Sequence, residues 1–188
     1  QADTSGEAMQ RLEVFLARRG LSGSDALGAA DALLNLDDRL AAARTHTADV
    51  KDKVATVRAM NVDAAVGGGL PAEFESHAMS ELRTQYLAIK SESDRAEARL
   101  GPRNPERIAL DTQLAGARDR IAAELRRIVA ALQAELKQAV EAEQGLAARL
   151  AEAKLDAEAM ATLRGLRDAA RQAAAEPARD QGAGAVND

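Results

Sequence analysis

Apolar residues recur along most of this chain at alternating steps of three and four, the spacing of a heptad seam on a helix face. The pattern is most regular from Ala26 to Val57, where only Thr47 interrupts its apolar character. It predicts helices over about 5–19, 24–60, 71–100 and 105–175. The seam residues expected to supply most of the burial are Leu33, Leu36, Leu40, Val50, Val54, Leu82, Tyr86, Ile89, Ile121, Leu125, Ile128 and Leu132.

Residues 100–106, Leu-Gly-Pro-Arg-Asn-Pro-Glu, separate the last two helical patterns. Gly101 can take the left-handed conformation that ends a helix, and Pro102 cannot continue one. Asn104 can cap the next helix, whose first position suits Pro105. The sequence therefore predicts a tight hairpin tip made of Gly101, Pro102, Arg103, Asn104 and Pro105. The expected fold is all-α, an antiparallel hairpin or coiled-coil-like bundle of about four helices with a very long last one.

Breaks in the periodicity divide the chain further. Gly20 is a natural end for the first helix. We interpret residues 61–70, which include Gly67-Gly68-Gly69, as a flexible linker outside any helix. Residues 1–175 are predicted to form one helical arm, and the aperiodic residues 176–188 a disordered tail. The last helix is too long to pair with the third alone, so its distal half needs the first two helices, an upstream continuation or a second copy.

Composition supports a narrow seam, because aromatic residues make up only 2% of the chain and cannot fill a thick core. The net charge of -5 gives no overall basic field to attract nucleic acid. The absence of cysteine excludes disulfides, thiolate catalysis and cysteine-bound metals. No run of 18 apolar residues is long enough to span a bilayer. The start lacks Met and any signal peptide, which suggests a piece of a longer protein.

Catalytic, metal and cofactor sites are not expected. His46 and His77 belong to different helices, and neither has another histidine four residues away. Carboxylates alternate with Lys and Arg, which is typical of solvated helix faces. The glycine triplet follows no strand and precedes no Lys-Ser or Lys-Thr, so it is not a phosphate loop. A basic cluster, Arg118, Arg120, Arg126 and Arg127, is diluted by acidic neighbours, so we expect no nucleic-acid partner.

Several segments resemble one family. Residues 82–86, Leu-Arg-Thr-Gln-Tyr, followed by Gly-Pro-Arg-Asn-Pro at 101–105, look like an "LRxQY … GPRHP" segment, with Asn104 where His is expected. Residues 121–128 look like "IxxELRRI", and further likenesses lie at 14–21, 40–48 and 141–146. In this order the segments resemble the periplasmic region of the polysaccharide co-polymerases, the chain-length determinants of exopolysaccharide export. The likeness covers about residues 8–160.

The resemblance implies a non-enzymatic arm that rises into the periplasm from an inner-membrane homo-oligomer. Its role would be to help control polymer length and to link the polymerase to an outer-membrane polysaccharide export protein. The tip residues would contact other copies or the export protein, with Arg103 foremost. The likeness fades beyond about residue 165, and the kinase domain and membrane-proximal α/β base of many relatives have no counterpart in this sequence.

Two other protein classes fit a long helical hairpin. One is the adaptor hairpin of a membrane-fusion protein in an efflux or secretion system, although such hairpins normally insert between halves of lipoyl-like β domains and this sequence has no strand pattern. The other is a cytoplasmic coiled-coil scaffold. An enzyme is the least expected class, because no convergent catalytic groups are present.

Overall fold

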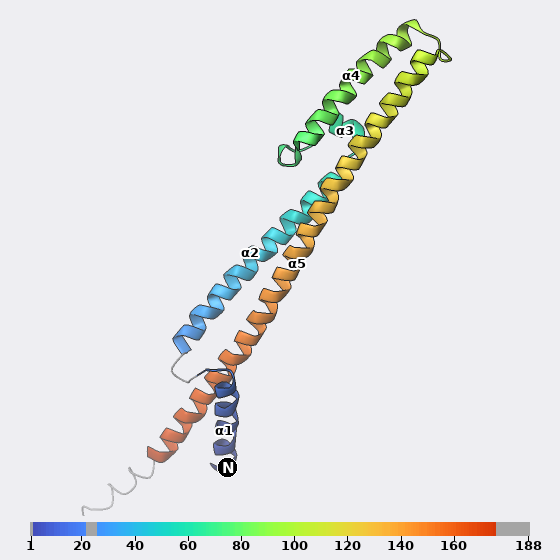
Figure 1. Ribbon diagram of the computed structural model, residues 1–188. Helices are drawn as coiled ribbons and strands as arrows, with labels where there is room; N and C mark the ends of the chain where they lie inside the picture. The colour runs from blue at the N-terminus through green and yellow to red at the C-terminus, as the bar shows by residue number, and fades with distance from the viewer. Residues whose placement is uncertain (1, 22–25, 176–188) are drawn as a thin grey trace, which may run out of the picture. The chain divides into compact units, whose positions relative to one another are not determined.

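A computed structural model of the chain describes residues 2–21 and 26–175 (Figure 1). Across these residues the chain is helical and has no strand, so the predicted all-α fold is confirmed. The last helix has 71 residues, Pro105–Ala175, which are the bounds predicted from the sequence. The elements are α1 (Ala2–Arg18), α2 (Ala26–Arg58), α3 (Val62–Val66), the 3-10 turn η1 (Ala72–Phe74), α4 (His77–Arg99) and α5 (Pro105–Ala175). The predicted disordered tail, 176–188, lies outside the described residues.

The chain divides into two compact units. One combines residues 1–43 with the chain from 142 onward, and the other is residues 44–141. Helices α2 and α5 contribute residues to both units, because the boundaries at 43/44 and 141/142 fall inside them. The predicted arm over 1–175 is therefore described below as two bodies, each by itself.

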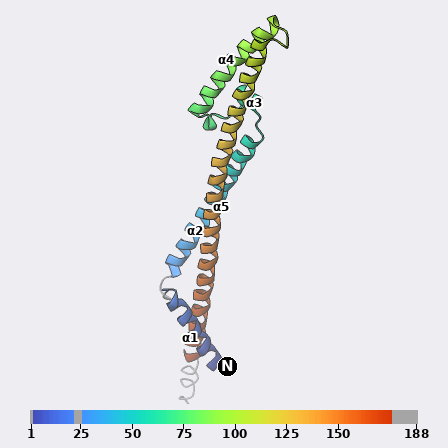
Figure 2. The same cartoon turned by 45° about the vertical axis from the view of Figure 1, so that its right-hand side comes forward.

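In the first unit, α1 packs beside the C-terminal part of α5 (Figures 1 and 2). Leu16, Met160 and Leu163 form its buried core. Arg19 Nη1 lies 2.6 Å from Asp156 Oδ1 and fixes the end of α1 against α5. Gly20, with φ of +70°, ends α1 in the left-handed conformation that glycine adopts without strain.

In the second unit, the end of α2, the helix α4 and the N-terminal half of α5 enclose one core. Met79 and Ile121 have no exposed surface. Helices α4 and α5 run antiparallel, side by side in both views, and are joined by the tip (Figures 1 and 2). The buried residues of this core are Val54, Val57, Ala65, Leu70, Met79, Tyr86, Ala117, Ile121, Leu125 and Leu132.

The stretch between α2 and α4 differs from the predicted linker, because its first half forms the helix α3. The Asn61 side chain caps α3, with Oδ1 accepting from the Ala64 amide at 2.8 Å. After α3, Gly68 has φ of +83°, and the Gly69 amide donates to the Ala64 carbonyl at 2.8 Å. A Cβ on Gly69 would lie 2.9 Å from that carbonyl oxygen. These two glycines permit a tight helix end, and the prediction of a helix-free linker is wrong over 62–66.

Helix α4 begins at His77, six residues after the predicted start at Pro71. Leu70 offers no side-chain acceptor for the first amides of a helix that starts at Pro71. Ser76 does, because its Oγ accepts from the Met79 amide at 3.0 Å. Pro71 instead precedes the short turn η1.

Two arginines fasten α3 to its neighbours. Arg118 of α5 reaches both carboxylate oxygens of Asp63, at 2.6 and 3.2 Å, and donates to the Tyr86 hydroxyl at 3.4 Å. Arg83 of α4 donates to the Ala65 carbonyl at the C-terminal end of α3, at 3.2 Å. The hydrogen bond from Arg118 lowers the pKa of Asp63. Arg118, one of the four arginines of the basic cluster in the sequence, therefore holds α3 against α5.

Glu124 joins the start of α4 to α5. This residue is largely buried, with 9% of its surface exposed, and its carboxylate accepts hydrogen bonds from three donor atoms. Ser76 Oγ donates to Oε1 at 3.0 Å, while Arg127 donates through Nη2 at 2.6 Å and through Nε at 2.9 Å. The bonds from Arg127, followed by the bond from Ser76, lower the pKa of Glu124.

This network predicts an acid-dependent loss of stability. A carboxylate whose pKa is lower in the folded chain stabilises the fold above its unfolded pKa, and that contribution is lost as the pH falls through the folded pKa. We expect Glu124→Gln to lower stability near neutral pH and to reduce the loss on acidification below about pH 4, the unfolded range of glutamate. Urea denaturation of wild type and variant at pH 7 and pH 3 measures both effects. Asp119→Asn, an exposed change on the same helix, should leave the pH dependence unaltered, and equal changes in both variants would contradict the assignment.

The seam of α5 gives a second prediction. Leu125 is 6% exposed, so Leu125→Asp buries a charge without a partner and should destabilise the chain by about 3 kcal/mol or more. Leu87→Asp is the matched control, because Leu87 is 51% exposed on α4 of the same unit. Thermal unfolding followed by circular dichroism should show a large loss for the first variant and a small change for the second. Similar melting of both variants would contradict the seam assignment.

Candidate functional site at the hairpin tip

The turn between α4 and α5 is held by its own backbone and by the side chains of Asn104 and Arg107. Helix α4 ends when Leu100 becomes extended, with φ of -117° and ψ of 141°. The Asn104 amide donates to the Gly101 carbonyl at 3.0 Å, which closes the turn. Asn104 Oδ1 accepts from the Glu106 amide at 2.9 Å and caps the first turn of α5. Asn104 thus has the capping role that its position in the sequence predicts.

Gly101 does not have the expected left-handed conformation. Within the described part of the chain, only Gly20 and Gly68 have a positive φ. The physical reason is Pro102, whose ring biases the preceding residue towards extended conformations. The chain leaves α4 through the extended Leu100, so glycine is not needed at 101 for a left-handed helix end.

Arg107 closes the hairpin from the side. Its guanidinium donates to the Leu100 carbonyl at 3.4 Å and to Glu97 Oε1 at 3.0 Å. We did not identify this pair from the sequence, although a signal was present. Glu97 and Arg107 are equally far along the chain from Pro102, and residues equidistant from a turn face each other across an antiparallel pair.

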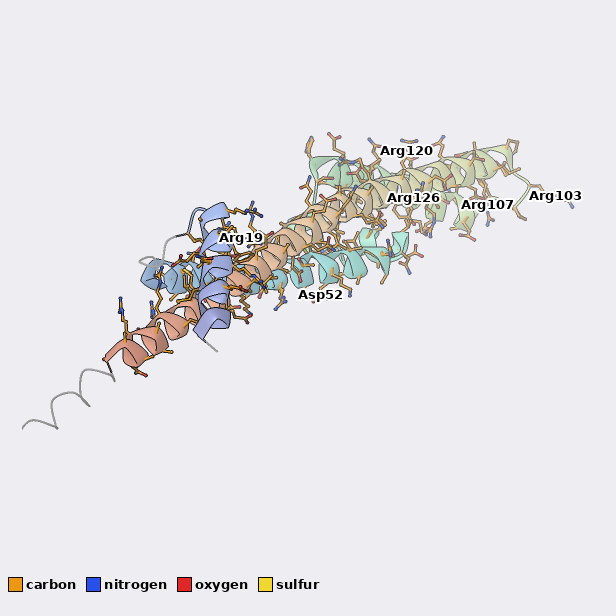
Figure 3. The ribbon with its side chains drawn as sticks, turned by 90° about the horizontal axis from the view of Figure 1, so that it is seen from below. Arg19, Asp52, Arg103, Arg107, Arg120 and Arg126 are labelled. Atoms are coloured by element: carbon orange, nitrogen blue, oxygen red, sulfur yellow. The ribbon has the colours of Figure 1, made fainter. Side chains whose placement is uncertain are left out.

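The tip leaves its central residues open to a partner. Gly101, Pro102, Arg103 and Pro105 are exposed, and Asn104 is half-buried. Figure 3 shows Arg103 at the end of the hairpin, with its side chain pointing away from both helices. Arg103 makes no ion pair with any residue that the structure describes, so its guanidinium keeps its full capacity to bind an anion.

A shallow groove between α4 and α5 lies beside the tip. It is lined by Glu92, Arg95, Arg99, Glu106, Ala109, Leu110 and Gln113. Arg95 and Arg99 form no ion pair within the described ranges, and the Arg99 Nε donates only to the Arg95 carbonyl of its own helix, at 3.4 Å. Neither arginine was predicted from the sequence as a site residue, although the two lie one helical turn apart just before the hairpin tip.

The predicted seam residues all lie away from solvent. Leu40, Val50, Val54, Tyr86, Ile121, Leu125 and Leu132 are buried, and Leu33, Leu36, Leu82, Ile89 and Ile128 are half-buried. The core of the second unit brings together Val54, Leu82, Tyr86, Ile89, Ile121, Leu125, Ile128 and Leu132. Val50 belongs to the same unit, whereas Leu33, Leu36 and Leu40 belong to the first.

Other site chemistry is sparse in the described ranges. Over 2–21 and 26–175, no three His, Asp or Glu side chains are grouped so that they could hold a metal ion. His77 Nε2 lies 3.1 Å from Glu81 Oε1 on the exposed face of α4. None of the described helices is both long enough and apolar enough to cross a membrane.

Comparisons of the sequence with protein-family models and with curated proteins, and of the structure with solved structures, give no match. What the chain does must therefore be argued from its own residues. The tip is the strongest candidate site, because it combines a fixed backbone with exposed cationic side chains.

The capping role of Asn104 can be tested directly. Asn104→Ala removes the side-chain acceptor and should destabilise the chain by about 1 kcal/mol. Hydrogen exchange of the amides in the first turn of α5 should become faster. Asn35→Ala, at an exposed position inside α2, is the control and should be neutral or slightly stabilising. Unchanged exchange in Asn104→Ala would mean that the turn is held without this cap.

Proposed function

We propose that this chain is the periplasmic helical arm of a polysaccharide co-polymerase in a bacterial inner membrane. In this proposal the arm is not an enzyme. It belongs to a homo-oligomer, helps to control the length of an exopolysaccharide, and links the polymerase to an outer-membrane export protein. Contacts through the hairpin tip, with Arg103 at their centre, carry out the link.

The observation that carries the proposal is where the resembling segments lie. Residues 82–86 are on α4, residues 101–105 form the tip, and residues 121–128 are on α5, all in one compact unit. Leu82 and Tyr86 share a core with Ile121, Leu125 and Ile128. These three segments of the resemblance therefore also form a spatial unit, a hairpin with an exposed cationic tip, whereas residues 14–21 belong to the other unit.

The physical arrangement suits a structural role. The described residues build long helices around narrow seams. The polar contacts of the second unit hold α3 and α4 in place against α5. A rigid support below a fixed turn presents the tip at low entropic cost, which favours binding by a preorganised surface.

The proposal is tested in the source bacterium by deleting the gene and measuring the chain-length distribution of secreted polysaccharide. We expect deletion to alter that distribution and the wild-type gene to restore it. Arg103→Glu should fail to restore it, because reversing the tip charge opposes the same partner. Arg126→Glu, an exposed change on α5 away from the tip, should restore it as the wild type does (Figure 3).

An unaltered polymer in the deletion strain would overturn the proposal. The membrane-fusion adaptor predicts a different phenotype, increased sensitivity to exported toxic compounds with normal polysaccharide. The two hypotheses also differ in the intact gene. A co-polymerase arm requires an apolar segment of at least about 18 residues on each side, whereas an adaptor hairpin is flanked by lipoyl-like β segments.

A further inference from the structure

Between Arg95 and Arg107 the chain has four arginines and two glutamates, so this stretch has two positive charges in excess within a chain of net charge -5. The excess is not spread evenly around the hairpin. On one flank, Lys90 pairs with Asp94, Arg107 with Glu97, and Arg118 with Asp63. The other flank and the tip carry Arg95, Arg99 and Arg103, which have no carboxylate partner within the described ranges.

We infer that the groove beside the tip, with Arg95, Arg99 and Arg103, docks an acidic segment of a partner protein. This inference rests on the proposed function, in which the tip contacts a partner, and it names the chemistry of that partner. The occupant is a helical segment with carboxylates one turn apart, lying along α4 towards the tip.

The spacing of the cations supports a helical partner. Arg95 and Arg99 are four residues apart on α4, so their side chains are neighbours on one face, with Cβ atoms about 5–6 Å apart. Glutamates four residues apart on a facing helix have the same spacing. Arginine is suited to this role because its planar guanidinium binds carboxylates through two parallel hydrogen bonds.

The groove favours a protein over an acidic polysaccharide. Glu92 and Glu106 line it together with the arginines, so a uniformly anionic polymer would meet two like charges there. Leu110 adds an apolar side chain to the lining of the groove. The aromatic residues Phe15, Phe74 and Tyr86 all lie outside residues 87–113, so no aromatic face is available for stacking on a sugar ring.

A second copy of the chain that docked tip to tip would not supply carboxylates to Arg95, Arg99 and Arg103. It would bring Arg103 of one chain towards Arg103 of the other and add repulsion where the excess charge is already positive. The missing partner charge must therefore come from another surface.

The test uses the purified chain and fluorescence anisotropy with three labelled probes. The first is an alanine-based helical peptide with glutamates four residues apart, the second replaces these with glutamine, and the third is an oligogalacturonate, whose sugars also carry carboxylates. We expect the acidic peptide to bind at least about tenfold more tightly than the neutral peptide, and more tightly than the sugar. Its affinity should fall as the salt concentration rises.

Two triple variants separate the site from the total charge. Arg95→Gln, Arg99→Gln and Arg103→Gln together should reduce binding of the acidic peptide to the level of the neutral one. The control variant replaces three exposed cations of the same unit, Lys51, Arg58 and Arg126, by glutamine and should retain binding. Both lose the same net charge, and circular dichroism checks that both remain folded.

Equal binding of acidic and neutral peptides, or an equal loss in both triple variants, would overturn the inference. Tighter binding of the oligogalacturonate would overturn the protein partner in favour of a glycan. Failure of the proposed function has a different signature, because polysaccharide length in cells would then be insensitive to Arg103 while the peptide still binds the purified chain.

Discussion

Burial of one face of α5 is the constraint on which the second unit depends. Ile121 is fully enclosed and Leu125 nearly so, and the apolar surfaces of α4, α3 and the end of α2 converge on them. A chain with few aromatic residues has little other apolar surface to bury, so packing along this seam supplies most of the driving force. The polar contacts then decide how the helices are fixed around it.

Those polar contacts concentrate where helices begin and end. Ser76 caps α4 and also donates to Glu124 of α5, so one hydroxyl sets both the start of α4 and its position along α5. Arg118 fixes α3 through Asp63, and Arg107 fixes the tip through Glu97. Each uses a charge-assisted hydrogen bond to join segments distant in sequence or separated by a turn.

The same arrangement explains why the tip is the candidate site. Around the end of the hairpin, Lys90, Arg107 and Arg118 are paired with carboxylates on one flank, whereas Arg95, Arg99 and Arg103 on the other flank and at the tip have no carboxylate partner within the described ranges. An exposed cation on a fixed backbone retains its capacity for an external carboxylate without first breaking an internal pair. The proposed arm function and the proposed acidic partner both depend on this asymmetry.

Sequence periodicity by itself determined the all-α fold, the long last helix and the cap at Asn104, because each depends on interactions between residues close along the chain. It did not reveal α3, the start of α4 after its cap Ser76 or the ion pair between Arg107 and Glu97. The glycines at 68 and 69 were expected to be flexible, but their tight turn depends on the Ala64 carbonyl. The ion pairs between helices were decided only by the tertiary structure, because helix packing brings Asp63 to Arg118 and leaves Arg95 and Arg99 without a carboxylate.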